Sequence, residues 1–138
     1  MIKATTKSRP GHHRVTLPRA PRVPCRRTHL LRLGEHKRAL KRATLRDCAQ
    51  RCVYCGICLD LQIATLDHVQ PLAKGGIHAP GNVVAACGTC NRRKGDMLPH
   101  EFFHRYPSAG LNFLAYARVV HRALKRNARR AVSLAMAA

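Results

Sequence analysis

The sequence is short of the residues that build a large core, and short of acidic residues. Its 138 residues include no Trp, three Phe and three Tyr, and only six Asp or Glu against 26 Lys or Arg. With so few large apolar side chains, we expect a bound metal or a partner to add to the stability of the fold. There is no apolar run of 18 residues, which argues against a membrane-spanning helix. No secretion signal is recognisable, which favours a protein that acts inside the cell, in the cytoplasm.

Positive charge is the strongest bulk signal. The formal net charge is +20 and the isoelectric point about 11.2, which indicates a polyanionic partner, most simply nucleic acid. Residues 1–50 carry a net +12, residues 51–100 a net +2 and residues 101–138 a net +6. The pattern predicts a compact, nearly neutral site between two flanks that bind a polyanion. Basic tails that only aid solubility are the alternative, and the Arg-rich start also resembles an organelle transit peptide in composition.

The two flanks differ in their patterns. Residues 1–33 hold four Pro among scattered Arg without periodicity, and we predict a disordered basic tail there. A short helix is expected from Glu35 to near Arg51, leading into a central domain over residues 34–100. Within residues 101–138, apolar residues recur at three- and four-residue steps after Gly110, which predicts one long amphipathic helix. A different face of that helix carries a basic stripe, which is either a phosphate-binding surface or a solvated face: Arg118, Arg122, Arg126 and Arg129.

Four of the seven cysteines form a paired pattern. Cys52 and Cys55 are separated by two residues, and so are Cys87 and Cys90. Each such pair can turn both thiolates toward one ion, so the two pairs predict a closed tetrahedral zinc site. The pair Cys55 and Cys58 is also a possible knuckle. Gly56 favours the first pairing because it suits the turn after the second thiolate. Cys25, Cys48 and Cys58 are then ordinary thiols.

The segment between the two knuckles predicts two strands and a helical turn. Residues 64–69 and 82–87 have strand-like apolar runs, and Pro71 ends the first of them. A helical turn follows Cys90 and is limited by Gly95. The expected order is therefore knuckle, strand, loop, strand, knuckle and helix.

A carboxylate and an imidazole stand side by side on the first of these strands. Asp67 and the amide oxygen of Asn91 are hard ligands that suit Mg²⁺, and a neutral His68 near such an ion can deprotonate water. Arg92, Arg93 and Lys94 are placed to contact a phosphodiester. A capping carboxylate and a hydrogen-bonded structural histidine are the plain alternative. Because neighbouring strand residues point to opposite faces, Asp67 and His68 share a site only at a distorted strand or at its edge.

Three motifs together resemble a known family. CVYCG, LDHVQPLAKGG and GNVVAACGTCNRRKGD occur in this order and are similar to HNH endonucleases of the ββα-metal (His-Me finger) fold, in the subgroup with a four-cysteine zinc site. The resemblance covers about residues 46–98. It implies an α+β fold, a small zinc-stabilised ββα-metal core with flanking helices.

The resemblance also implies roles for individual residues. His68 corresponds to the general base that activates water, and Asp67 and Asn91 to the ligands of a catalytic Mg²⁺ or Mn²⁺. Asn82 corresponds to the Asn that braces the loop and the base, and Lys94 to a phosphate-facing residue of the helix. The zinc ligands implied are Cys52, Cys55, Cys87 and Cys90. The third motif position is Asn91 rather than His, as is common in the four-cysteine subgroup.

The function expected from these observations is metal-dependent hydrolysis of DNA phosphodiester bonds, with duplex DNA as the partner. The absence of an aromatic platform for single-stranded bases favours contacts to a duplex backbone. A zinc-stabilised, basic nucleic-acid-binding protein without catalysis is the second hypothesis. A nuclease directed at RNA with the same site is the third.

Overall fold

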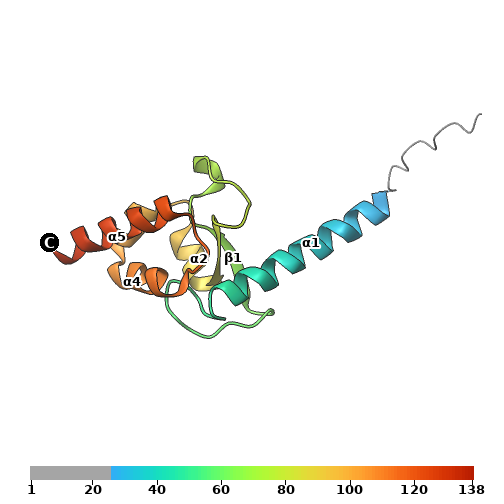
Figure 1. Ribbon diagram of the computed structural model, residues 1–138, viewed down its shortest axis with the longest axis horizontal. Coiled ribbons are helices and arrows are strands. Elements are labelled where there is room, and N and C mark those ends of the chain that lie inside the picture. The colour runs from blue at the N-terminus through green and yellow to red at the C-terminus, as the bar shows by residue number, and fades with distance from the viewer. Residues whose placement is uncertain (1–25) are drawn as a thin grey trace, which may run out of the picture.

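The computed structural model describes residues 26–138. Two strands and a short helix form its centre, and longer helices flank them (Figure 1). The elements are α1 (Arg26–Asp47), β1 (Ala64–His68), η1 (Leu72–Lys74), β2 (Val83–Cys87), α2 (Gly88–Lys94), α3 (Pro99–Arg105), α4 (Pro107–Tyr116) and α5 (Arg122–Met136). No helix in the described residues is both long and apolar enough to span a membrane.

The central unit is a ββα arrangement, as the sequence predicted. β1 and β2 pair antiparallel in a regular register that runs from Ala64 opposite Cys87 to His68 opposite Val83. β2 passes directly into α2, which packs back on both strands. Gly95, with φ at 50°, ends α2, where a positive φ favours Gly. The α+β fold class with a small ββα core is therefore confirmed.

Helix α1 begins earlier than expected. The sequence predicted a disordered tail over residues 1–33, of which residues 1–25 lie outside the described part, whereas residues 26–33 belong to α1. Among residues 32–47 of this helix, the buried ones are Thr44 and Leu45, near its end, and the exposed part projects from the body (Figure 1). Proline is absent after Pro24 up to the end of α1, so nothing in the local sequence prevents a longer helix.

The end of α1 is tied to the first cysteine knuckle. Ala49 and Gln50 both have φ at 54°, and the backbone N–H of Gln50 donates to the carbonyl of Leu45 at 2.9 Å. This reversal, together with the buried thiol of Cys48, ends the helix at Asp47 rather than near Arg51. It sets the direction in which α1 leaves the body.

The single helix expected after Gly110 is in fact divided between two helices, α4 and α5. Pro107 begins α4, and the chain leaves helical structure between Ala117 and Arg122. There Val120 forms a bridge with Gly81, and the N–H of His121 donates to the carbonyl of Gly81 at 3.0 Å. This pairing with a distant loop replaces the helical hydrogen bonds, so a continuous helix over residues 111–136 is wrong.

An aromatic cluster joins these helices to the centre. Tyr54 lies in the first knuckle, with its ring centroid 5.2 Å from that of Phe102 and 6.4 Å from that of Phe113. Phe103 and Phe113 are 4.9 Å apart and both are fully buried. Residues 34–100 and 101–138, which the sequence divided, therefore share one hydrophobic core.

Candidate active site and zinc centre

The four cysteines of the two knuckles come together. The Sγ atoms of Cys52, Cys55, Cys87 and Cys90 all lie within 4.8 Å of one another, and those of Cys55 and Cys87 are 3.9 Å apart. Zinc–sulfur bonds of about 2.3 Å in a tetrahedron place sulfurs about 3.8 Å apart. The donor set and its spacing therefore fit one zinc ion.

Local backbone geometry aims these thiols at one point. In the first knuckle the N–H of Gly56 donates to the carbonyl of Cys52 at 2.8 Å, with Gly56 at φ 76°. In the second, Cys87 caps α2 and its Sγ accepts from the N–H of Cys90 at 3.4 Å. Burial raises the pKa of the Cys52 and Cys90 thiols, and neighbouring sulfurs add to this at Cys90. A bound cation would supply the charge that stabilises the thiolates.

Two further cysteines lie outside this cluster. Cys48 is buried and accepts a hydrogen bond from the N–H of Ala85 at 3.4 Å. Cys58 is exposed, and its backbone forms an isolated antiparallel β-bridge with that of Arg51. The structure thus groups Cys52 and Cys55, rather than Cys55 and Cys58, with the second knuckle. Cys25 lies outside the described residues.

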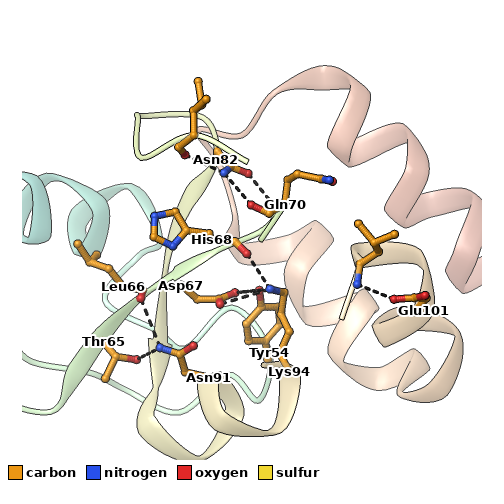
Figure 2. A network of polar contacts seen from close by, with 12 residues as sticks. Tyr54, Thr65, Leu66, Asp67, His68, Gln70, Asn82, Asn91, Lys94 and Glu101 are labelled. Carbon is orange, nitrogen blue, oxygen red and sulfur yellow. Dashed lines mark hydrogen bonds and ion pairs between the residues drawn. The ribbon is translucent and has the colours of Figure 1, made fainter. Parts of the chain in front are cut away.

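Asp67 is buried between two donors. Its side chain is 5% exposed. The hydroxyl of Tyr54 donates to its Oδ2 at 2.5 Å, and the Nζ of Lys94 is 3.3 Å from Oδ1 and 3.2 Å from Oδ2 (Figure 2). Burial raises the pKa of Asp67, while the Lys94 ammonium and the Tyr54 hydroxyl act in the opposite direction. Burial and the neighbouring Asp67 hold the pKa of Tyr54 well above its usual value, so Tyr54 remains a donor.

Lys94 is an interior residue and does not face a phosphate. It is 1% exposed, and besides Asp67 its Nζ donates to the carbonyl of His68 at 2.7 Å. An ammonium on the face of α2 that packs on β1 is buried only when it is paired, and Asp67 provides the partner. The expected phosphate contact of Lys94 is therefore wrong.

Asn91 lies on the same side of the sheet as Asp67. Its Nδ2 donates to the hydroxyl of Thr65 at 3.0 Å and to the carbonyl of Leu66 at 3.3 Å. Both contacts use the amide nitrogen, which leaves the Oδ1 atom as an available acceptor. Asn91 thus presents the oxygen that a hard cation would use.

His68 points away from Asp67 and Lys94, as Figure 2 shows. The register is regular up to His68, the last residue of β1, so neighbouring side chains leave opposite sides of the strand. The strand is therefore not distorted at Asp67 and His68, and the site lies instead at the end of β1, which is an edge strand. An open cavity of about 380 Å³ is lined by Asp67, His68 and Asn91, together with Asp96.

The environment of His68 favours its neutral form. Burial lowers its pKa, and the nearby His78 and Lys94 lower it further, whereas Asp67 raises it. The Nε2 of His68 lies 2.7 Å from the Nδ1 of His78. A neutral imidazole has a free lone pair, as a general base requires.

Asn82 closes the loop between the two strands. Its Nδ2 donates to the carbonyls of Ile77 at 2.8 Å and Gln70 at 3.0 Å, and its Oδ1 accepts from the N–H of Gln70 at 2.8 Å (Figure 2). Asn82 is 2% exposed. Because all these contacts are to backbone, Asn82 shapes the loop and does not touch the cavity directly.

The arginines expected to contact phosphate are on the surface but not in one stripe. Arg92 and Arg93 are exposed on α2, and the guanidinium of Arg93 lies 5.6 Å from the ring centroid of Tyr106. Arg118 is exposed in the segment before α5 and is not part of that helix. The remaining three are exposed on α5: Arg122, Arg126 and Arg129.

Three residues near the site were not anticipated. Tyr54 and His78 contact Asp67 and His68 respectively, and Asp96 lines the same cavity. Tyr54 stands inside the quoted CVYCG motif, which could have drawn attention to it. His78 and Asp96 carry no signal in the local sequence.

Comparison with known proteins agrees with this ββα unit and its cysteine cluster. Residues 52–107 match the family HNH endonuclease, and this segment runs from the first zinc knuckle through α3. The central segment is therefore similar to the HNH endonucleases, and the resemblance stated above is confirmed over these residues. No curated protein matches the sequence.

A distant likeness exists among solved structures. The crystal structure of the Type II-C Cas9 enzyme from Actinomyces naeslundii matches with a TM-score of 0.44 and 18% sequence identity, over 80% of this chain. The chain spans only 14% of that protein's length. A score of this size does not establish a common fold.

Proposed function

We propose that this protein is a metal-dependent endonuclease that hydrolyses DNA phosphodiester bonds. The observation that carries the proposal is the cavity lined by Asp67, His68 and Asn91 inside a segment that matches the HNH endonucleases. The setting we infer is the cytoplasm, where cysteines remain reduced and available to zinc.

His68 is the general base in this proposal. Its lowered pKa keeps the ring neutral near pH 7, so it can take a proton from a water in the cavity. The water oxygen then forms a bond to phosphorus while the bond from phosphorus to the 3′ oxygen breaks. The departing oxygen takes a proton from solvent, which leaves a 5′-phosphate and a 3′-hydroxyl.

Asp67 and Asn91 are the residues that would hold a catalytic divalent cation. Tyr54 and Lys94 account for three contacts to the Asp67 carboxylate, which has about four acceptor positions. One carboxylate and one amide oxygen suit Mg²⁺ or Mn²⁺, which keep most of their waters. When bound, such an ion would stabilise negative charge on the phosphate and on the leaving oxygen.

The zinc ion has a structural role in this proposal. The four cysteines would fill all four ligand positions of a tetrahedral ion, so no position would remain for water or substrate. The ion would join the segment after α1 to the start of α2. That link holds β1 and α2, which carry His68 and Asn91, in one unit.

Exposed basic side chains supply the nucleic-acid surface of the proposal. On α1 only two acidic residues, Glu35 and Asp47, oppose the basic residues, and Asp47 pairs with Arg46. The excess of positive charge on this helix is matched to the negative charge of a duplex backbone. The exposed basic residues of α1 and α5 are Arg32, Lys37, Arg38, Arg42, Arg46, Arg122, Arg126, Arg129 and Arg130.

A second candidate function is nucleic-acid binding without catalysis. The observation in its favour is the closed contact of Asp67 with Tyr54 and Lys94, which is also what a structural carboxylate would show. In that case His68 would be dispensable for every activity of the protein. RNA remains the alternative substrate.

Cleavage of supercoiled plasmid separates the two candidates. Zinc-loaded protein is tested with Mg²⁺ or Mn²⁺ and with EDTA, beside His68→Ala and the control His104→Ala, which changes an exposed histidine on α3. The proposal expects metal-dependent cutting by the wild type and the control, and loss of cutting by His68→Ala with DNA affinity retained. Binding by all three proteins without cutting would support the second candidate. A parallel RNA substrate tests the substrate class.

A further inference from the structure

A second histidine contacts the proposed base. The Nδ1 of His78 lies 2.7 Å from the Nε2 of His68, with the ring centroids 5.0 Å apart and the planes tilted by 53°. His78 is exposed and belongs to the loop between β1 and β2. A nitrogen–nitrogen distance this short is a hydrogen bond, so one of the two rings donates and the other accepts.

The loop that carries His78 is held in place at several points. Asn82 binds the carbonyl of Ile77, the residue next to His78, and both backbone groups of Gln70. The N–H of Val69 donates to the carbonyl of Asn82 at 2.8 Å. Val69 directly follows His68, and Ile77 directly precedes His78. The contacts of Asn82 therefore tie the backbone next to His68 to the backbone next to His78. The position of His78 is therefore set by the loop and not by its own exposed side chain.

A close approach inside the same loop adds to this constraint. A Cβ atom at Gly76 would lie 1.9 Å from the carbonyl oxygen of Gln70, so only Gly fits there. The N–H of Gly76 also donates to the carbonyl of Pro71 at 2.9 Å. The turn two residues before His78 is thus closed on the chain that leaves β1.

Asp67 is not available to orient His68, although it is the adjacent residue. It leaves the opposite side of the strand and is engaged by Tyr54 and Lys94. A general base in an active site is usually oriented by a third group that accepts from its second nitrogen. Among the described residues, His78 is the side chain hydrogen-bonded to the ring of His68.

We propose that His78 is the positioning residue of the base: its Nδ1 accepts from the Nε2–H of His68, and this leaves the Nδ1 of His68 as the nitrogen that takes the proton from water. This inference rests on the proposed function for its catalytic part. The hydrogen bond and its direction are properties of the folded protein alone.

The proton balance follows from this arrangement. When His68 takes a proton at Nδ1, its ring becomes an imidazolium whose Nε2–H points at the lone pair of His78. The Nε2 proton can pass to the Nδ1 of His78, and His78 can release its own Nε2 proton to solvent because it is exposed. Both rings are then neutral again, and one proton has moved from the water to the bulk.

The first test observes the shared proton by nuclear magnetic resonance on zinc-loaded, uniformly ¹⁵N-labelled protein without added Mg²⁺ or Mn²⁺. The expected result is a slowly exchanging ring proton bonded to the Nε2 of His68, with a scalar coupling across the hydrogen bond to the Nδ1 of His78. His78→Ala should remove that signal. His78→Asn should keep a protected proton, since the amide oxygen can accept in place of Nδ1. A proton resident on the Nδ1 of His78, or no shared proton, would overturn the proposal.

The second test separates positioning from a general structural effect. We expect His78→Ala to lower kcat about 10- to 100-fold, as loss of an orienting partner does, with KM and the melting temperature unchanged. His78→Asn should recover most of kcat, and His100→Ala, an exposed histidine on α3, should have no effect. An unchanged kcat in His78→Ala would refute the catalytic part. If the wild type does not cut at all, the proposed function fails while the resonance experiment still judges the hydrogen bond.

Discussion

Two nearby exposed cysteines should differ in their importance for zinc binding. Cys55 and Cys58 are three residues apart, but only the Sγ of Cys55 lies in the four-sulfur cluster. We predict that Cys55→Ser abolishes stable zinc binding and that Cys58→Ser leaves it unchanged. A serine hydroxyl does not replace a thiolate as a zinc ligand, and Cys58 is already displaced from the cluster by its bridge with Arg51.

The expected size of the effect follows from the thin core. The large apolar side chains that are fully buried are few, chiefly Phe102, Phe103 and Phe113. Structural zinc contributes on the order of 10 kcal/mol, whereas whole domains are stable by about 5–15 kcal/mol. Loss of the ion therefore removes most of the folding free energy, and Cys55→Ser should be largely unfolded at 25 °C. The wild type should unfold in the same way when a strong chelator removes its zinc.

The measurement combines metal content with thermal unfolding. Zinc per chain is determined by mass spectrometry of the purified proteins, and unfolding is followed by circular dichroism with and without chelator. Wild type and Cys58→Ser should each carry one zinc and share a melting temperature that falls on chelation. Equal zinc content in Cys55→Ser and wild type would refute the assignment, and zinc loss in Cys58→Ser would favour the other register.

Three further predictions concern the buried ion pair, the basic helix and the base. Lys94→Met should cost about 3–5 kcal/mol of unfolding free energy, because it leaves the buried Asp67 carboxylate without its cation; Lys74→Met, which removes an exposed ion pair, should cost under about 1 kcal/mol in the same urea titration. Four basic residues of α1 are changed to Gln: Lys37, Arg38, Lys41 and Arg42. The logarithm of the DNA association constant, measured by fluorescence anisotropy, should then fall less steeply with the logarithm of the salt concentration, with a slope smaller by about 3 to 4. An unchanged slope would exclude α1 from the interface. Because burial lowers the pKa of His68, the base stays neutral to a lower pH than an ordinary histidine. Cleavage should therefore fall off only as the pH drops below about 6.5, and a loss centred above that value would contradict the assignment.

Several features of the fold could be predicted because their determinants are local. The two-residue spacing of each cysteine pair dictates a knuckle, and the apolar runs before Pro71 and before Cys87 dictate two strands. Gly95 ends α2 where expected. In each case the residues that decide the structure stand within a few positions of one another.

Other features were wrong because a distant partner decides them. The helix expected over residues 111–136 is interrupted where Val120 and His121 pair with Gly81. Helical periodicity continues through this segment and gives no sign of that contact. The family resemblance implied that Lys94 faces a phosphate, but the inward face of α2 brings it to Asp67.

By itself the sequence determined the resemblance of its central segment to the HNH endonucleases, the ββα order, the pairing of four cysteines and the basic character of both flanks. The resemblance follows from three motifs in order, and the other features follow from residue spacing and composition, so none of them needs knowledge of long-range contacts. Only the tertiary structure decided that Asp67 is held by Tyr54 and Lys94 and that His68 faces His78. Those contacts join residues 10 to 27 positions apart, and which of many polar residues meet at such a separation depends on how the loop closes and the helix packs.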